Sequence, residues 1–267
     1  MGLLRIEDYP EQAPRQPASA EYHRIVTGMA DGVDGIDAAY GDDIYQHVAL
    51  FVPERPTGQV LAYMHGGRWS YGYKEYAAFM APAFNAAGII LASIGHRLVP
   101  AVDFRGGFAD VNAGIGWVRE NIATYGGDPE NLFVSGHSSG GHYAAMYALK
   151  TGGVRGAAPI SGVYDLSASG YPQDNSPPCL PAGSDGRAES PIYNIDGTPP
   201  PFLVTWGGDD YDFLIPQAKH FADALEAAGG AVERLECSGK THFSVSHDSC
   251  AGDGEWTKAV IDWMARC

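Results

Sequence analysis

The sequence predicts an α/β protein with a mostly parallel sheet that helices cover on both faces. Short apolar runs alternate along the chain with longer segments in which apolar residues recur at spacings of three and four, as is typical of strands joined by helices. The run at residues 89–94 is almost wholly apolar, as expected for a strand buried on both faces. The chain has 267 residues, 45% of them hydrophobic, so we expect a single domain over residues 1–267.

An N-terminal arm, residues 1–40, precedes the first predicted strand. It is rich in Pro, Ala, Gly and Asp, so we expect irregular chain with one short helix near residues 19–26. Strands are then predicted at 46–52, where a proline ends the run, and at 59–64, after the turn residues Pro56–Gly58.

Helices and strands alternate in the middle of the chain. A helix predicted at 76–87 ends at Gly88, and the buried strand 89–94 follows. The next helix, 110–124, has an apolar face formed by Val111, Ile115, Val118 and Ile122. The elements predicted after it are a strand at 131–134, a helix at 141–149 and a strand at 156–160.

Residues 162–200 interrupt this alternation. They contain many Pro, Gly, Ser and Asp residues without clear periodicity, and a structureless segment of this length is uncommon unless it is functional. We interpret it as a loop-rich insertion. The elements predicted after it are a strand at 202–206, a helix at 216–228 that begins at a proline and ends at glycines, an edge strand at 232–237 and a helix at 254–265.

Composition excludes several classes of protein. The net charge is −15, which repels phosphate backbones, so we do not expect a nucleic acid partner. No run of 18 apolar residues is present, so no membrane span is expected. The N-terminus lacks the apolar core of a signal peptide, and we expect a cytoplasmic protein. The four cysteines lack the spacing of metal ligands and are expected to be free thiols, although the sequence leaves open one disulfide among the last three. The sequence also leaves open whether the protein forms a homodimer.

The pentapeptide Gly136–His137–Ser138–Ser139–Gly140 is the strongest functional motif. It lies between a predicted strand and a predicted helix, which is the context of a nucleophile elbow. The sharp turn needs small residues two positions either side of Ser138, and Gly136 and Gly140 meet that need. Ser138 would stand at a helix N-terminus, where backbone amides favour developing negative charge. We therefore predict that Ser138 is a catalytic nucleophile.

A serine nucleophile needs a base, and the base needs an orienting acid. His242 follows the last predicted strand and is our candidate base, with His247 as the alternative. Two other histidines downstream of the motif are disfavoured because we expect His142 to point away from Ser138 and His220 to lie on a helix.

The acid is expected in the segment directly after the strand 202–206. Asp210 is our candidate, with Asp209 and Asp212 as alternatives that would form turns or caps. Backbone amides of Gly66, Gly67 and Ser139 are the expected donors to an oxyanion. No metal or other cofactor is expected, because the chain has no zinc-binding or phosphate-binding motif.

Four motifs carry a resemblance to a known family. They are His65–Gly66–Gly67–Arg68–Trp69, the pentapeptide at 136–140, Ser161–Gly162–Val163–Tyr164–Asp165–Leu166 and Thr241–His242–Phe243. From about residue 40 to the end, the chain resembles the α/β-hydrolase superfamily, in the branch that holds hormone-sensitive-lipase-like carboxylesterases and kynurenine formamidase (arylformamidase). The resemblance implies an α/β-hydrolase fold. From its composition, we expect the loop-rich insertion at residues 162–200 to lie as a cap over the active site of such a fold.

The chain departs from the formamidase pattern in three places, one of which is the Pro-rich insertion near Cys179–Gly183, which has no match in that pattern. Arg68 stands where formamidases usually have an aromatic residue, and Ser139 replaces the usual alanine. Arg68 has the geometry to bind a substrate carboxylate, although a surface salt bridge would explain it equally well. Trp69 and Tyr164 are candidates for the lining of an aryl or acyl pocket, with core packing as the alternative for each.

These observations favour a serine hydrolase that cleaves an ester of a small molecule, with aromatic substrates among the candidates. An arylformamidase uses the same catalytic residues and is the first alternative. A biosynthetic acyltransferase on the same acyl-enzyme route is the second alternative. A non-catalytic binding protein on this fold is the third, because a fold alone does not prove chemistry.

Overall fold

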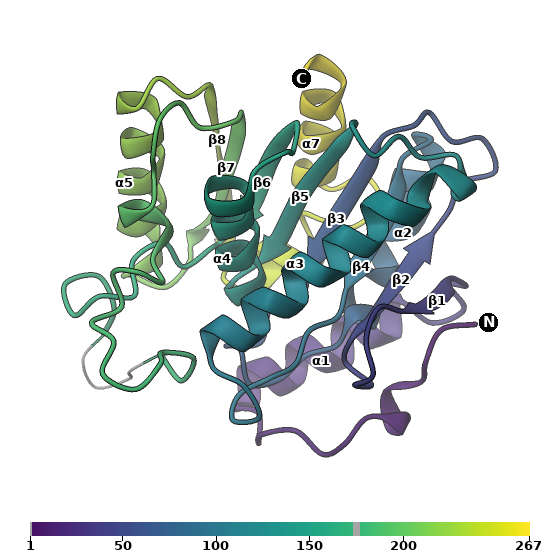
Figure 1. Ribbon diagram of the computed structural model, residues 1–267, viewed down its shortest axis with the longest axis horizontal. Coiled ribbons are helices and arrows are strands. Elements are labelled where there is room, and N and C mark those ends of the chain that lie inside the picture. Colours follow the sequence, from purple (N-terminus) through teal and green to yellow (C-terminus); the bar gives the residue numbers. More distant parts are fainter. Residues whose placement is uncertain (1, 173–176) are drawn as a thin grey trace.

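The computed structural model describes residues 2–172 and 177–267 of the chain. Within these ranges the strands form one eight-stranded sheet, which Figure 1 shows from one face. Its strands, in their order across the sheet, are β1 (Ile36–Ala39), β2 (His47–Phe51), β4 (Ile90–Ile94), β3 (Val60–Met64), β5 (Leu132–His137), β6 (Gly156–Ile160), β7 (Phe202–Asp209) and β8 (Val232–Thr241). The β1–β2 and β2–β4 pairs are antiparallel and all the others are parallel. The prediction of a mostly parallel sheet is confirmed.

Helices cover both faces of this sheet (Figure 1). The α-helices are α1 (Pro17–Met29), α2 (Ala81–Ala86), α3 (Phe104–Asn121), α4 (Ser139–Met146), α5 (Leu214–Ala227), α6 (Ser244–His247) and α7 (Glu255–Arg266). Shorter helical turns are the 3₁₀ helices Ile6–Asp8, Lys74–Met80, Ile122–Tyr125 and Pro191–Tyr193 and the π-helix Tyr147–Thr151. One buried cluster holds side chains of α3, α4 and α5, and a second holds side chains of α1, α2 and α7.

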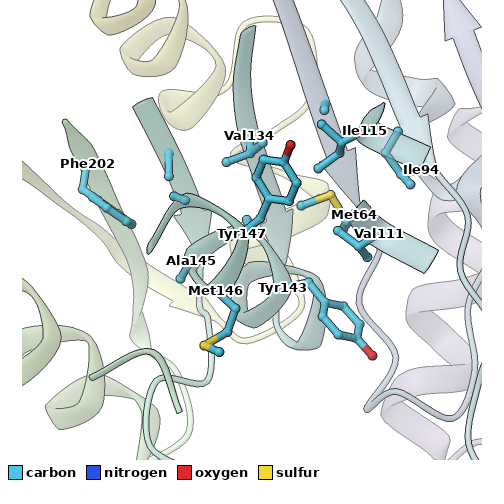
Figure 2. Close-up of a cluster of buried hydrophobic side chains, with 14 of the residues drawn as sticks. Met64, Ile94, Val111, Ile115, Val134, Tyr143, Ala145, Met146, Tyr147 and Phe202 are labelled. Atoms are coloured by element: carbon cyan, nitrogen blue, oxygen red, sulfur yellow. The ribbon is translucent and has the colours of Figure 1, made fainter. Parts of the chain in front are cut away.

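The apolar periodicity of α3 explains how it packs. The predicted face of Val111, Ile115, Val118 and Ile122 is fully buried. Figure 2 shows Val111 and Ile115 in one cluster with Met64 of β3 and Ile94 of β4. On the opposite face of the sheet, Trp263 of α7 packs edge-on against Phe133 of β5, with ring centroids 5.5 Å apart. Each face therefore has its own core.

The N-terminal arm and the start of α3 differ from the prediction, for identifiable reasons. The arm at residues 1–40 holds the 13-residue helix α1 and the strand β1, and β1 was missed because it is a short edge strand in which no residue is fully buried. Helix α3 begins at Phe104, before the predicted 110, because Asp103 caps it by accepting hydrogen bonds from the amides of Arg105 and Gly106. The glycines in that first turn are weak helix formers and concealed it.

The insertion at 162–200 has little regular structure in its described part, and its residues 173–176 lie outside the described residues. Buried Gln217 of α5 anchors its beginning. The Gln217 Oε1 atom accepts hydrogen bonds from the amides of Tyr164 and Asp165, and its Nε2 atom donates to the carbonyls of Asp165 and Gly170. The Gln217 side chain thus makes hydrogen bonds to backbone groups that would otherwise be satisfied within regular secondary structure.

No helix in the described ranges is both long enough and apolar enough to cross a bilayer. All four cysteines are free thiols.

A buried charged network ties the N-terminal arm to the rest of the fold. The Lys74 ammonium is fully buried and lies 2.8 Å from Asp37 Oδ2, 2.5 Å from Glu75 Oε1 and 2.7 Å from the Tyr9 hydroxyl. Burial favours a raised pKa for Asp37, but its bonds to Lys74 and His47 outweigh burial and lower it. The arm, β1 and the 3₁₀ helix Lys74–Met80 are thereby joined around one cation.

We predict that Lys74→Met destabilises the protein by about 3–5 kcal/mol, because it leaves two buried carboxylates without their cation. Lys219→Met is the matched control. The Lys219–Glu236 pair is half exposed at 3.5 Å, so its loss is expected to cost below about 1 kcal/mol. Urea unfolding measures both values, and equal small losses would contradict the stabilising role of the buried network.

Candidate active site

Ser138 lies on a strained turn between β5 and α4. Its backbone has φ 56° and ψ −117°, a conformation that is costly for a residue other than glycine. A β-carbon at Gly136 would lie 2.4 Å from the Gly140 carbonyl carbon, and one at Gly140 would lie 2.1 Å from the Met64 carbonyl oxygen. The backbone of the turn therefore packs directly on β3 and on itself, and only glycine fits at these two positions.

His242 and Asp210 meet Ser138 at the carboxyl edge of the sheet. His242 follows the end of β8, and its Nε2 atom lies 2.9 Å from Ser138 Oγ. Its Nδ1 atom lies 2.8 Å from Asp210 Oδ1, which follows the end of β7. An ionised carboxylate accepts a hydrogen bond from Nδ1–H, and this leaves the Nε2 lone pair facing the serine hydroxyl.

The environment of Asp210 keeps its carboxylate ionised. The side chain is fully buried, which favours a raised pKa, but hydrogen bonds from His242, Ser161 and the Tyr211 amide outweigh burial and lower the pKa of Asp210. Ser161 Oγ donates to Asp210 Oδ2 at 2.5 Å, and the Tyr211 amide donates to Oδ1 at 2.7 Å. Both oxygens of the carboxylate are thus held in place.

The other residues that the sequence offered for these positions lie elsewhere. Asp209 and Asp212 are exposed. His247 Nδ1 pairs with Asp248 Oδ1 at 2.7 Å. His142 is turned away from Ser138, as expected, because its Nδ1 accepts from the indole N–H of Trp69 and its Nε2 donates to the Glu189 carbonyl. His220 lies exposed on α5.

The loop after β3 runs beside Ser138. A β-carbon at Gly66 would lie 3.3 Å from Ser138 Cβ, so this backbone borders the Ser138 side chain directly. Within the described residues, the amides of Gly66, Gly67 and Ser139 have no hydrogen-bond acceptor. Amides without acceptors beside Ser138 are what an oxyanion hole requires.

A cavity of about 370 Å³ opens onto Ser138 and His242. Aromatic side chains form much of its lining, among them Tyr22, Trp69, Tyr71, Tyr171, Tyr211 and Phe213. The insertion contributes Val163 and Tyr171. The volume and the apolar lining suit a small organic molecule.

The N-terminal arm forms one wall of this cavity. Ser19 and Tyr22 of α1 both line it. The Ser19 hydroxyl lies 2.8 Å from the Tyr71 hydroxyl, and the Tyr22 hydroxyl lies 2.9 Å from Ser246 Oγ. Helix α1 therefore joins the loop that follows β3 to the segment that follows His242, a role that the sequence did not reveal.

Two of the three predicted substrate contacts line the cavity. Arg68 and Trp69 do so, and both have positive φ values, 54° and 57°. The expectation for Tyr164 is corrected, because this side chain is fully buried and stacks on Phe221 of α5 at 4.3 Å. Core packing, the alternative reading of Tyr164, accounts for it.

Sequence reasoning missed two side chains that bond to the His242–Asp210 pair. Ser161, at the end of β6, bonds to Asp210, and His137 Nε2 donates to the His242 carbonyl at 2.7 Å. Burial, and next the proximity of His242, hold the pKa of His137 below its usual range, so this ring is neutral. The rule that selected Asp210, a polar residue directly after a buried strand, would also have selected Ser161. Among the described residues, no group of three or more His, Cys, Asp or Glu side chains is arranged to hold a metal ion.

Solved structures share this fold. The apo form of Thermogutta terrifontis esterase 2 has a TM-score of 0.75, covering 87% of this chain and 94% of its own at 21% identity. A truncated carbohydrate esterase from gut microbiota has a TM-score of 0.74, covering 86% and 94% at 19% identity. The chain has the α/β-hydrolase fold, as predicted.

Sequence comparison finds relatives of both predicted kinds. The BD-FAE family model matches residues 48–161. A probable isoprenylcysteine alpha-carbonyl methylesterase of Arabidopsis thaliana is 28% identical over 76% of this chain and 49% of its own length. Esterase LipQ of Mycobacterium tuberculosis is 33% identical over 64% of this chain and 47% of its own length. Kynurenine formamidase of Salmo salar is 24% identical over 86% of this chain and 82% of its own length. The predicted resemblance to carboxylesterases and kynurenine formamidase is confirmed, and the chain spans about half the length of the first two relatives.

We predict that Gly140→Ala destabilises the protein by on the order of 3 kcal/mol, because the new methyl group meets the Met64 carbonyl of β3 and α4 has to shift. Gly116→Ala is the control. A β-carbon at Gly116 of α3 has no atom within 4 Å, so this change is expected to stabilise the helix by about 0.5–1 kcal/mol. Urea unfolding measures the free energy of unfolding of both variants. If the two substitutions changed it in the same direction, the packing account of the turn would be contradicted.

Proposed function

We propose that this chain is a cofactor-free serine hydrolase that cleaves a carboxylic ester of a small molecule through an acyl-enzyme on Ser138. The observation that carries the proposal is the continuous chain of hydrogen bonds from Ser138 Oγ through His242 to Asp210, at the floor of a cavity large enough for a small substrate. Non-catalytic binding does not need such a chain, so the geometry favours catalysis over the binding-protein alternative.

The proposed reaction has two steps. The Ser138 hydroxyl attacks the ester carbonyl while His242 Nε2 takes its proton, and Asp210 stabilises the imidazolium that forms. The amides of Gly66, Gly67 and Ser139 are the donors to the oxyanion in this proposal. His242 then returns the proton to the leaving alcohol, and a water activated by His242 releases the acid.

Ester hydrolysis is our first choice and formamide hydrolysis the second. Esterases stand first among the relatives, and Arg68 lines the cavity where formamidases usually have an aromatic residue. The formamidase reading is favoured by the relative from Salmo salar, which matches over most of both chains. Ser138 is partly exposed at the cavity, so water has access to the proposed acyl-enzyme, which favours hydrolysis over acyl transfer. The cytoplasmic location and the homodimer stay predictions from the sequence.

Replacing Ser138 with Ala is expected to reduce turnover by on the order of 10⁴–10⁶-fold while folding is preserved, because the nucleophile is lost. A paired assay of p-nitrophenyl acetate and N-formylkynurenine measures this and separates the two substrate classes. Formamide turnover at ordinary enzyme rates that is lost in the variant would make the protein an arylformamidase. Near-normal turnover by the Ala variant would refute the serine mechanism.

Asp210→Asn is expected to lower kcat by about 10³–10⁴-fold, because the amide favours the wrong tautomer of His242. Asp209→Asn and Asp212→Asn remove the same charge from the same segment and are expected to keep rates close to wild type, since both side chains are exposed. Steady-state kinetics on p-nitrophenyl acetate decides the assignment. A large loss in either control, with Asp210→Asn nearly normal, would move the acid to that residue.

A further inference from the structure

Ser161 occupies a position that connects the nucleophile to the acid. It follows β6, which lies between the strand of Ser138 and the strand that leads to Asp210. The Ser138 amide donates to the Ile160 carbonyl at 2.9 Å, and the Ser161 amide donates to the Thr205 carbonyl of β7 at 2.8 Å. The backbone at the end of β6 is therefore bonded to both catalytic strands.

The Ser161 side chain is directed by an unfavourable backbone conformation. Its φ is 47°, in the region that residues other than glycine rarely adopt. The residue is 1% exposed, and its hydroxyl donates to Asp210 Oδ2, the oxygen that His242 does not use. A strained, buried serine that completes the bonding of a buried carboxylate is a candidate for a functional role rather than a packing one.

Given the serine hydrolase function proposed above, we propose that Ser161 is a positioning residue that holds the Asp210 carboxylate ionised and aligned on His242. The hydroxyl stabilises negative charge on Oδ2 and prevents rotation of the carboxylate, so that Oδ1 remains on the imidazole Nδ1–H. Ser161 is not among the residues that line the cavity, and its hydroxyl is bonded to Asp210 rather than to Ser138.

The other titratable groups that face Asp210 do not share its proton in the working pH range. They are His137, Tyr164 and Tyr211, besides His242 itself. Burial raises the pKa of both tyrosines and lowers the pKa of His137, so all three are neutral. Removal of the Ser161 donor raises the proton affinity of the Asp210–His242 pair, and the acid limb of the pH profile moves to higher pH.

The test compares Ser161→Ala and Ser161→Gly with wild type, using the pH dependence of kcat/KM for p-nitrophenyl acetate and of the rate at which a fluorophosphonate labels Ser138. Both variants are expected to lose about 10- to 100-fold in rate, the equivalent of one hydrogen bond to a charged group, and to shift the acid limb upward. Glycine relieves the positive φ, so Ser161→Gly keeps the test valid if the alanine variant folds poorly. A uniform loss without a shifted limb would overturn the proposal.

Ser135→Ala is the matched control. Ser135 is also a fully buried serine and lies on β5, the strand that leads to Ser138, but its hydroxyl donates to the Ala158 carbonyl at 2.7 Å. Its removal is expected to leave the acid limb unmoved, and an equal shift would show that any lost buried hydroxyl has this effect. In an Asp210→Asn background, Ser161→Ala is expected to add little further loss, and a full additional loss would overturn the proposal.

The two readouts separate this role from the choice of substrate. Suppose that the fluorophosphonate labels Ser138, that the acid limb of the labelling rate shifts in the Ser161 variants, and that no ester is hydrolysed. The substrate proposal then fails and the positioning role stands. If esters are hydrolysed and the limb does not move, the positioning role alone fails. A wild-type protein that neither labels nor hydrolyses overturns both.

Discussion

The contact between the backbone of the turn at residues 136–140 and the end of β3 is the constraint on which the candidate site depends. Gly140 lies so close to the Met64 carbonyl that no side chain fits between them. This contact sets the distance between α4 and the sheet, and it thereby fixes the position of Ser138 at the start of that helix. The loop after β3 then passes the same serine, so the nucleophile and the amides beside it are positioned by one packing interaction rather than by two independent loops.

The sheet topology converts this local contact into a complete site. Strands β5, β6, β7 and β8 are neighbours and run parallel, so residues at their carboxyl ends approach one another although they are far apart in sequence. Ser138, Ser161, Asp210 and His242 each follow or end one of these strands. Their hydrogen bonds form one connected line across the edge of the sheet. In α/β sheets this edge is the usual place for function.

That regularity explains what the sequence predicted and what it did not. Ser138 was selected because its pentapeptide lies between a predicted strand and a predicted helix. His242 and Asp210 were selected because each follows a predicted strand, and the structure brings the three residues together. Tyr164 was assigned to the pocket because a motif gives a residue's position but not the direction of its side chain, which Phe221 determines here. Strand β1 is too short and too exposed to leave a pattern. The partner of Tyr22 lies 224 positions away, and no local rule connects such residues.

The wall that α1 builds has a practical consequence for redesign. The residues proposed for chemistry all lie between Gly66 and His242, whereas Ser19 and Tyr22 reach the cavity from a helix that precedes the first strands. The segment of the sequence that shapes this side of the cavity is thus separate from the segments that carry the residues proposed for catalysis. A library of variants confined to α1 would vary the range of molecules admitted while every proposed catalytic side chain stayed unchanged.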